Sequence, residues 1–338
     1  MATRTDVAKL AGVSVATVSN VFIGRKPVSA ELTEKVKKAA EKLSYSPNYI
    51  ARCLSLGRSH IIGIVITDYV NPFHMEIIRG IEHYAKRRGY IVTTFLHENC
   101  ENGSEVVNYE TLQVDAILNF TTNVVSESFI NSLVSEHTVF VDFGRNRGMS
   151  FVQDHSEAME AAVKRLCELG HKKVGFISLV DKKRFEQDQR GILYRKLVEK
   201  YGLCNDENLI VYNEDITLKS EIAGYLCGKE FIERNTGGTA VLVMNDLAAF
   251  GFYRLLYEKR LKVPEDISVI GFDGVSMLQY ATPRLSTISL DKFSFGTMMA
   301  EKVINCIESG EKGIGLEYGA KSIFLERESI GKIKNGCF

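Results

Sequence analysis

The first sixty residues repeat apolar positions with the period of short helices. The pattern predicts a first helix that is capped by Thr5 or Asp6 and ends at Gly12. A second helix is expected over residues 15–22, and a third begins at Ser29. Two short helices joined by so tight a turn form a helix-turn-helix.

The second predicted helix carries an outward face that is neither charged nor bulky. That face consists of Val15, Ala16, Ser19 and Asn20. A solvated helix would usually charge this face, and a buried one would fill it with large apolar groups. A helix that enters the major groove of DNA needs slim side chains that reach base edges. The pattern therefore favours a DNA-reading helix, although an ordinary three-helix unit shows the same stripes.

A short stretch after the third helix, residues 46–57, contains Pro47 at a position suited to a first helical turn. It predicts a helix of about two turns, which is too short to be stable alone in water. We expect it to order against its copy in a dimer together with DNA. An ordinary linker is the alternative.

Beyond residue 60, short apolar runs alternate with amphipathic stretches, which predicts an α/β body with mostly parallel sheets. The expected strands are Ile61–Thr67, Ile91–Leu96, Ala116–Phe120, Val139–Phe143, Val174–Ser178, Ile210–Tyr212, Ala240–Met244, Val269–Phe272, Thr287–Leu290 and Ile323–Glu326. The expected helices are Met75–Arg88, Ser156–Glu168, Lys219–Glu233, Leu247–Lys259 and Phe293–Ile307.

The charge balance of the whole chain hides a division between its two parts. The 338 residues hold 42 Lys and Arg against 42 Asp and Glu. Residues 1–60 have ten basic and four acidic side chains, a net charge of +6, which leaves 32 basic and 38 acidic, a net charge of −6, for the remainder. This asymmetry fits a small anion-binding module joined to a larger body. A solvated helical face explains the charge alone equally well.

Composition removes several other classes. No apolar run approaches 18 residues and the amino terminus is polar, so we expect neither a membrane span nor a secretory signal. The seven cysteines are scattered without a CxxC pair, and the seven histidines do not cluster. We therefore expect no disulfide framework, no metal and no cofactor, and a cytoplasmic protein.

The segments Asp6–Ser19, Tyr45–Asn48 and Ala51–Leu54 strongly resemble the headpiece of the LacI/GalR family of bacterial transcriptional regulators. The resemblance continues through the body, over Gly63–Ile66, Asn71–Phe73, Arg79–Ile81, Leu169–Val174, Asn245–Asp246, Val263–Asp273, Pro283–Ile288 and Glu326–Ser329. It implies a regulator that binds a palindromic operator as a dimer and is switched by a small effector, usually a sugar or a nucleobase-related metabolite. When bound to its operator, such a protein is associated with the nucleoid.

The resemblance also implies the architecture. A small all-α helix-turn-helix headpiece precedes an α/β body of two doubly wound parallel-sheet lobes, like a periplasmic sugar-binding protein, and ligands bind between the lobes at the carboxyl ends of strands. The expected divisions are a headpiece over 1–47, a hinge helix and linker over 48–60, a first lobe over 61–158 with 288–320, and a second lobe over 159–287 with 321–338.

For DNA, the resemblance implies roles residue by residue. Val15 and Ala16 are expected to touch thymine methyl groups, and Asn20 to hydrogen-bond adenine. Contacts to phosphates are assigned to Thr17, Ser19, Arg25 and Lys26. Leu54 matches the family's minor-groove wedge, and the residues expected to accompany it are Asn48, Ala51 and Arg52.

For the effector, the matching positions are Phe73, Arg190, Asn245 and Asp273, with Asp142 as a weaker match. A charged fork with a carboxylate and an amide suits a hydroxyl-rich ligand, because each hydroxyl both donates and accepts.

Several positions qualify this assignment. Asp154 precedes a predicted helix, where capping is a better interpretation than binding, and Asp246 has the two interpretations in equal measure. Leu193, Gly274 and Leu290 depart from the family pattern and leave the effector open.

An enzyme is not expected, since the sequence has no GxSxG or HExxH motif and no catalytic residues are assigned. Residues 315–322 nearly match a phosphate-binding loop, which we interpret as chance. A sugar-binding protein without regulatory output, a sugar-processing enzyme fused to a DNA module, and a regulator that needs a nucleobase-like corepressor remain alternatives. Nothing after Ser329 resembles a leucine-heptad tail, so a dimer is favoured over a tetramer.

Overall fold

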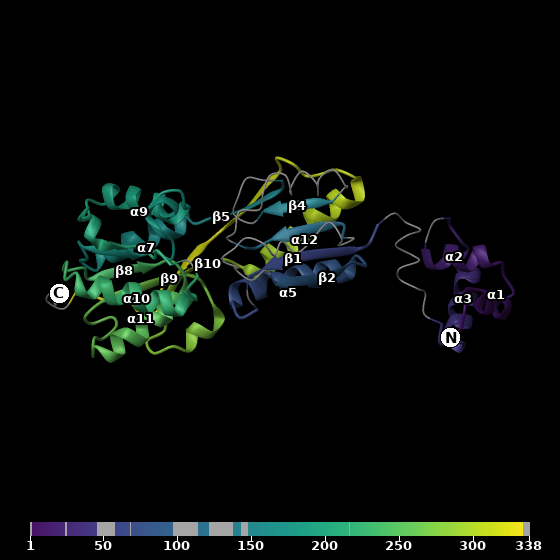
Figure 1. The fold of residues 1–338 in the computed structure, drawn as a ribbon, viewed down its shortest axis with the longest axis horizontal. Helices are drawn as coiled ribbons and strands as arrows, with labels where there is room; N and C mark the ends of the chain where they lie inside the picture. The colour runs from purple at the N-terminus through teal and green to yellow at the C-terminus, as the bar shows by residue number, and fades with distance from the viewer. Residues whose placement is uncertain are drawn as a thin grey trace.

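The computed structural model describes residues 2–23, 26–45, 58–67, 69–96, 114–121, 138–142, 148–215 and 217–333. Figure 1 shows the parts along the long axis of the molecule, with the helical headpiece at one end and two α/β lobes after it. The expected fold class, a small all-α headpiece with an α/β body of mostly parallel sheets, is confirmed.

The headpiece is built from three helices, α1 (Arg4–Ala11), α2 (Val15–Ile23) and α3 (Ala30–Lys42). They enclose a small core of buried apolar side chains from all three, which include Val7, Val18 and Val36. α2 packs against this core through Val18, Val21 and Phe22, so its opposite face lies outside the core.

The cap of the first helix differs from the prediction. Neither Thr5 nor Asp6 is the N-cap, because Thr3 takes that position and its side chain accepts the amide of Asp6. The Asp6 carboxylate in turn accepts a hydrogen bond from the Thr3 amide at 2.8 Å, which completes a capping box. Gly12 ends the helix in the left-handed conformation at φ 64°, as expected.

The first lobe holds a four-stranded parallel sheet in the order β2-β1-β3-β4. The strands are β1 (Ile61–Ile66), β2 (Ile91–Leu96), β3 (Ala116–Asn119) and β4 (Val139–Asp142). Helices α5 (Pro72–Arg87) and α12 (Lys292–Ser309) pack against each other very closely. A Cβ atom at Gly80 would lie 2.2 Å from the carbonyl oxygen of Phe293, so glycine is required there.

The second lobe holds a six-stranded sheet in the order β12-β10-β9-β8-β6-β7, in which only β12 runs antiparallel to its neighbour. Its strands are β6 (Val174–Ile177), β7 (Ile210–Val211), β8 (Ala240–Val243), β9 (Ser268–Asp273), β10 (Ser286–Ser289) and β12 (Ile323–Leu325). Its α-helices are α7 (Ser156–Glu168), α8 (Lys182–Phe185), α9 (Gln189–Lys200), α10 (Ser220–Glu233) and α11 (Asp246–Glu258), and its 3₁₀ helices are η2 (Glu207–Leu209) and η3 (Ser276–Tyr280). One buried core lies on each face of the sheet.

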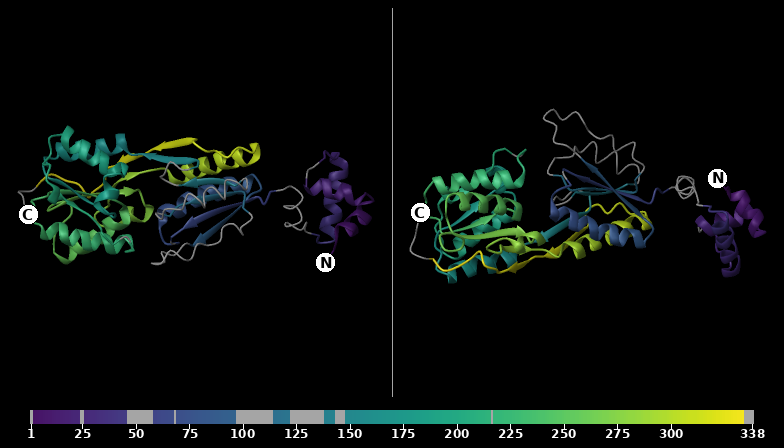
Figure 2. Two further views of the ribbon diagram at one scale, coloured as in Figure 1. Left: turned by 45° about the horizontal axis from the view of Figure 1, so that its top comes forward. Right: turned by 90° about the horizontal axis from the view of Figure 1, so that it is seen from below.

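The chain passes between the lobes where β5 (Ser150–Asp154) leads to α7, where β10 leads to α12, and where β11 (Glu317–Lys321) leads to β12. Figure 2 shows the last of these segments in yellow, running from one lobe to the other. β5 and β11 pair in parallel, and the amide of Ser322 donates to the carbonyl of Asp154 at 2.9 Å.

Every predicted strand is present, with its ends within one residue of the expected ones. The stretch that nearly matches a phosphate loop contains β11 and no helix follows it directly, in keeping with the interpretation as chance. Within the part of the chain that the structure describes, no helix combines the length and apolar character that a bilayer crossing needs.

Candidate functional site

The outward face of α2 presents the side chains singled out from the sequence. Val15 and Ala16 are exposed, Ser19 and Asn20 are half-buried, and Val18 on the opposite face is buried in the headpiece core. The helix is held at its start by Ser14, whose Oγ accepts the Thr17 amide at 3.1 Å and contacts the Thr17 hydroxyl at 2.9 Å. Lys26, just beyond the helix, is exposed.

The remaining residues predicted to contact DNA lie outside the described residues. They are Arg25, Asn48, Ala51, Arg52 and Leu54. The predicted hinge helix over 46–57 lies outside them too, so their roles stay predictions.

A second group of polar residues meets at the carboxyl ends of the strands in the second lobe. Asp273 ends β9 with φ 100°, a left-handed conformation that is strained for a residue with a side chain. Its carboxylate makes no hydrogen bond to any residue that the structure describes. Burial raises its pKa to about 6, although Arg190 and Lys292 act in the opposite direction. A partly buried carboxylate is thus held beside two cations with its oxygens available.

Arg190 is held rigidly in the first turn of α9. Its Nε and Nη2 donate to the two carboxylate oxygens of Asp188 at 2.9 and 2.8 Å, and its Nη1 donates to the carbonyl of Met244 at 2.8 Å. The guanidinium lies 5.9 Å from the ring of Phe272, and 24% of the side chain stays exposed. Burial raises the pKa of Asp188, but Arg190 outweighs it and the net shift is downward. The fork is therefore a fixed and charged group beside Asp273.

Asn245 caps a helix, a role that suits an asparagine side chain. Its side-chain oxygen accepts the Ala248 amide at 2.8 Å as the N-cap of α11, and its Nδ2 donates to the Ser220 hydroxyl at 3.0 Å. In this conformation both the oxygen and the nitrogen of the side-chain amide are hydrogen-bonded to protein groups. Asp154 is not the N-cap of α7, which is His155, but its carboxylate accepts the amide of Ser156, the first residue of that helix, at 2.9 Å.

Asp246 serves neither as a cap nor as an exposed ligand. It is fully buried, and its two oxygens accept the Thr287 hydroxyl and the Val275 amide, both at 2.7 Å. Burial raises its pKa to about 8, and the charge of Asp273 acts in the same direction. Sequence reasoning left this residue between two roles, and the structure assigns it to the turn that follows Asp273.

The two first-lobe candidates are less accessible. Phe73 is 5% exposed and belongs to the first-lobe core, and Asp142 is 1% exposed at the end of β4, where it accepts a hydrogen bond from Asn119 at 3.1 Å. The charges of Arg190 and Asp273 interact in the second lobe, whereas Phe73 and Asp142 are buried within the first lobe.

Two further groups at this place were not found from the sequence. His155 contacts the Ser322 hydroxyl through Nδ1 at 2.8 Å, which joins two of the interlobe segments. Burial lowers its pKa to about 4, with Arg190 acting in the same direction, so the imidazole is neutral at pH 7. The second group is Lys292, the first residue of α12. The one sequence signal for a fixed Arg190 side chain was Asp188, two residues before it.

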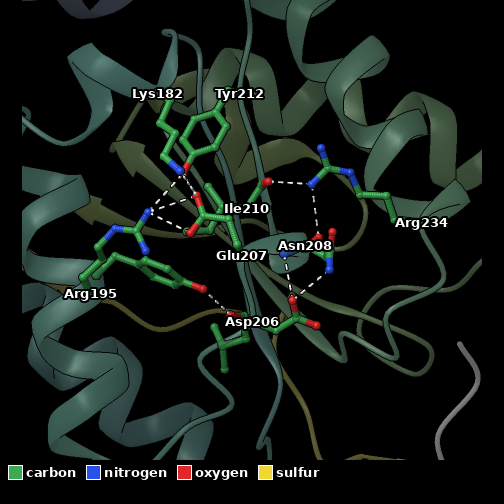
Figure 3. Close-up of polar contacts among 10 residues, drawn as sticks. Lys182, Arg195, Asp206, Glu207, Asn208, Ile210, Tyr212 and Arg234 are labelled. Carbon is green, nitrogen blue, oxygen red and sulfur yellow. Dashed lines mark hydrogen bonds and ion pairs between the residues drawn. The ribbon is translucent and has the colours of Figure 1, made fainter.

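A charged cluster around Glu207 contacts α8 and α9, the second of which carries Arg190 (Figure 3). The carboxylate of Glu207 accepts the Tyr212 hydroxyl at 2.7 Å, and it pairs with Lys182 of α8 and Arg195 of α9, both at 3.0 Å. Arg234 contacts β7 by donating a hydrogen bond to the carbonyl of Ile210 at 2.7 Å. Glu207 thus ties α8 and α9 to the end of β7.

Replacement of Glu207 by Gln is expected to destabilise the protein more at neutral pH than at low pH. Burial raises the pKa of Glu207, but hydrogen bonds from Tyr212, Lys182 and Arg195 outweigh it and lower the pKa to about 2. A lowered pKa gives stability that is present above the unfolded value of about 4.3 and is lost as the pH falls toward about 2. Urea unfolding at pH 7 and pH 2.5 measures this.

The matched control for that experiment is Glu199→Gln, on the exposed side of α9. Its unfolding free energy should stay close to that of the wild type at both pH values. A deficit of Glu207→Gln that is equal at pH 7 and pH 2.5 would contradict the assigned pKa.

Comparison with known proteins gives the following matches. A family model described as "Bacterial regulatory proteins, lacI family" matches residues 3–48, and one described as "Periplasmic binding protein-like domain" matches residues 163–328. The HTH-type transcriptional repressor PurR of Haemophilus influenzae is 30% identical over 324 residues, which cover 93% of this chain and 94% of that protein. The ribose operon repressor of Escherichia coli (strain K12) is 33% identical over 316 residues, which cover 91% and 93%.

Solved structures agree on the fold. The lac repressor dimer bound to operator and the anti-inducer ONPF has a TM-score of 0.79 and 22% identity, covering 97% of this chain and 98% of that one. The complex of the transcriptional regulator CelR with cellobiose has a TM-score of 0.69 and 23% identity, covering 97% and 100%. The same two-lobed body with a headpiece therefore occurs in both.

Proposed function

The chain belongs to the lacI family of bacterial regulatory proteins, and we propose that it represses transcription by binding a palindromic operator as a homodimer. A small sugar releases this homodimer from the operator. The relatives are named as repressors and not as enzymes, which confirms the expectation that this chain is a DNA-binding regulator. It works on chromosomal DNA in the bacterial cytoplasm.

The observation that carries the effector class is the pairing of the fixed Arg190 fork with the available carboxylate of Asp273. A sugar presents adjacent hydroxyls, each of which donates one hydrogen bond and accepts others. The guanidinium donates to hydroxyl oxygens and the carboxylate accepts hydroxyl protons, so the two groups together match a diol. One of the relatives is a ribose operon repressor, which supports a pentose as the first compound to examine.

The operator is read by the exposed face of α2. Val15 and Ala16 offer apolar contacts to thymine methyl groups, and Asn20 offers the paired donor and acceptor that match adenine. Lys26 adds a phosphate contact beside it, and Thr17 and Ser19 lie on the same helix. The excess of positive charge in the first sixty residues favours this approach to DNA.

A second copy of the chain is proposed to cover one face of the second lobe. Large apolar side chains on α10, α11 and η3 are exposed in the single chain, and they are Ile222, Leu226, Phe250, Tyr257, Met277 and Tyr280. An apolar face of this extent on a soluble protein is typical of an interface. A palindromic operator requires two copies related by a twofold axis, and this face supplies the self-complementary contact.

The proposed function is tested by operator binding. Fluorescence anisotropy with DNA from upstream of its own gene should show tight binding at 0.15 M salt. In a panel of pentoses, hexoses and nucleobases, D-ribose or another sugar should release the protein from that DNA. Asn20→Ala should cost about 1–3 kcal/mol at one symmetric base pair and leave other positions unchanged. Weakening that is equal on all sequences would contradict the base-reading role.

The other outcomes separate the alternatives. Binding of a sugar without any DNA binding would favour a sugar-binding protein without regulatory output. Strengthening of operator binding by a nucleobase would favour a corepressor. Indifference to all fragments, with and without the panel compounds, would overturn the proposal as a whole.

A further inference from the structure

In the turn at Asp273, the backbone amides and the backbone carbonyls are hydrogen-bonded by different groups. Asp273 and Gly274 are both left-handed, at φ 100° and 64°. At Gly274 a Cβ atom would lie 1.9 Å from the hydroxyl oxygen of Ser289, so only glycine fits this conformation. Two successive left-handed residues fix the peptide groups of the segment 273–275, which we call the 273–275 turn, and with them the direction of the Asp273 side chain.

The amide groups of the 273–275 turn are bound from the second lobe. The Val275 amide donates to Asp246 at 2.7 Å, and the Gly274 amide donates to the Thr287 hydroxyl at 3.2 Å. Thr287 in turn donates to the other oxygen of Asp246 at 2.7 Å. The carboxyl group of the fully buried Asp246 therefore binds one amide directly and the other through the Thr287 hydroxyl.

The carbonyl groups of the 273–275 turn are bound by Lys292. Its ammonium donates to the carbonyl oxygens of Asp273 at 2.7 Å, Gly274 at 2.9 Å and Leu290 at 3.3 Å, which uses all three of its protons. The side chain is only 4% exposed. The same ammonium lies 3.7 Å from the carboxylate of Glu76 on α5. A buried lysine is costly unless it is paired, and here its partners come from both lobes.

We propose that Lys292 is a positioning residue for the effector, because it holds Asp273 through the backbone of the 273–275 turn. Its contact with Glu76 couples effector binding at Asp273 to the first lobe. The ammonium itself is saturated by protein groups, so it acts through Asp273 and does not contact the ligand. The inference rests on the proposed function, since it takes Asp273 as an effector-binding group.

The geometry separates the two tasks of Lys292. Loss of the ammonium frees the carbonyls of the turn and lets Asp273 relax from its strained conformation, so effector affinity falls. Neutralisation of Glu76 leaves those hydrogen bonds in place and removes only the link to α5. Lys292→Met therefore addresses positioning, and Glu76→Gln addresses coupling between the lobes.

Hydrogen exchange of the full-length, ligand-free dimer tests positioning without any ligand. In Lys292→Met, the amides of Gly274 and Val275 should exchange at least about tenfold faster than in the wild type. In Glu76→Gln they should stay as in the wild type, whereas amides in the first turns of α5 should exchange faster. The control is Lys302→Met, which removes an equal charge from the same helix, where Lys302 contacts the ring of Tyr318 at 5.4 Å.

The second measurement is the ratio of operator affinities without and with the sugar that the panel identifies. Lys292→Met should lower affinity for the sugar roughly tenfold or more, whereas Glu76→Gln should keep the sugar affinity and reduce the ratio roughly tenfold. A residue with a merely structural role would leave this ratio unchanged.

Unchanged exchange at Gly274 and Val275 in Lys292→Met would overturn the positioning role, and an unchanged ratio in Glu76→Gln would overturn the link. If Lys292→Met fails to fold, Glu76→Gln still decides the link, and Lys292→Arg, which keeps the charge, decides the positioning role by the same exchange measurement. If no panel sugar binds, the proposed effector class fails, and the exchange experiment still decides the role of Lys292.

Discussion

Replacement of Phe250 by Arg is expected to separate the dimer into monomers and to weaken operator binding roughly 100- to 10,000-fold. Phe250 lies on α11 and is 48% exposed in the single chain, within the apolar face on α10, α11 and η3. Two arginines that meet there in a dimer would lose hydration without gaining a partner. Two linked headpieces bind one palindrome far more tightly than either does alone, so the loss of the dimer removes that gain.

Sedimentation velocity across a concentration series measures the first effect, and anisotropy on the operator measures the second. The side chain is half-exposed in the single chain, so the circular dichroism spectrum of the variant should stay close to that of the wild type, whereas its unfolding temperature should no longer rise with protein concentration. Ile314→Arg is the matched control, because Ile314 is also exposed but follows α12 in the first lobe. Dimers of Phe250→Arg as stable as those of the wild type would contradict the proposed interface.

The fold was predictable to the extent that burial leaves a local pattern. Parallel strands buried on both faces form continuous apolar runs such as β8 and β9, and these were found to within one residue. β11 was missed because it alternates exposed and half-buried positions, includes Gly319 and pairs only with β5. α9 was missed because Gly191 interrupts its pattern, although a Cβ there would lie 2.0 Å from the carbonyl oxygen of Phe185.

The candidate site was predictable by residue type more than by role. Asn245 was found as a polar group at the end of a strand, but the amide caps α11 and binds Ser220, which depends on how α10 packs beside it. Lys292 resembles an ordinary solvated residue at the start of a helix. Its burial arises from contacts with a turn 18 residues away in sequence, and no local pattern records them.

Replacement of Arg190 by Ala is expected to abolish the response to the effector while operator binding is kept. A hydrogen bond from a charged donor is worth about 1.5–3 kcal/mol, so the loss of the fork should lower effector affinity about 10- to 150-fold. The variant also leaves Asp188 without its cation, which adds repulsion between Asp188 and Asp273 near the ligand. Calorimetric titration with the identified sugar measures the affinity.

Arg195→Ala is the control that separates binding from stability. It removes a cation from the same helix α9, but Arg195 pairs with Glu207 and contacts Tyr212, away from Asp273. Arg195→Ala should therefore lower the unfolding temperature and keep the affinity for the sugar, whereas Arg190→Ala should lower that affinity and keep the affinity for the operator. If Arg190→Ala still released the operator at the sugar concentration that suffices for the wild type, the fork of Arg190 would not be part of the effector site.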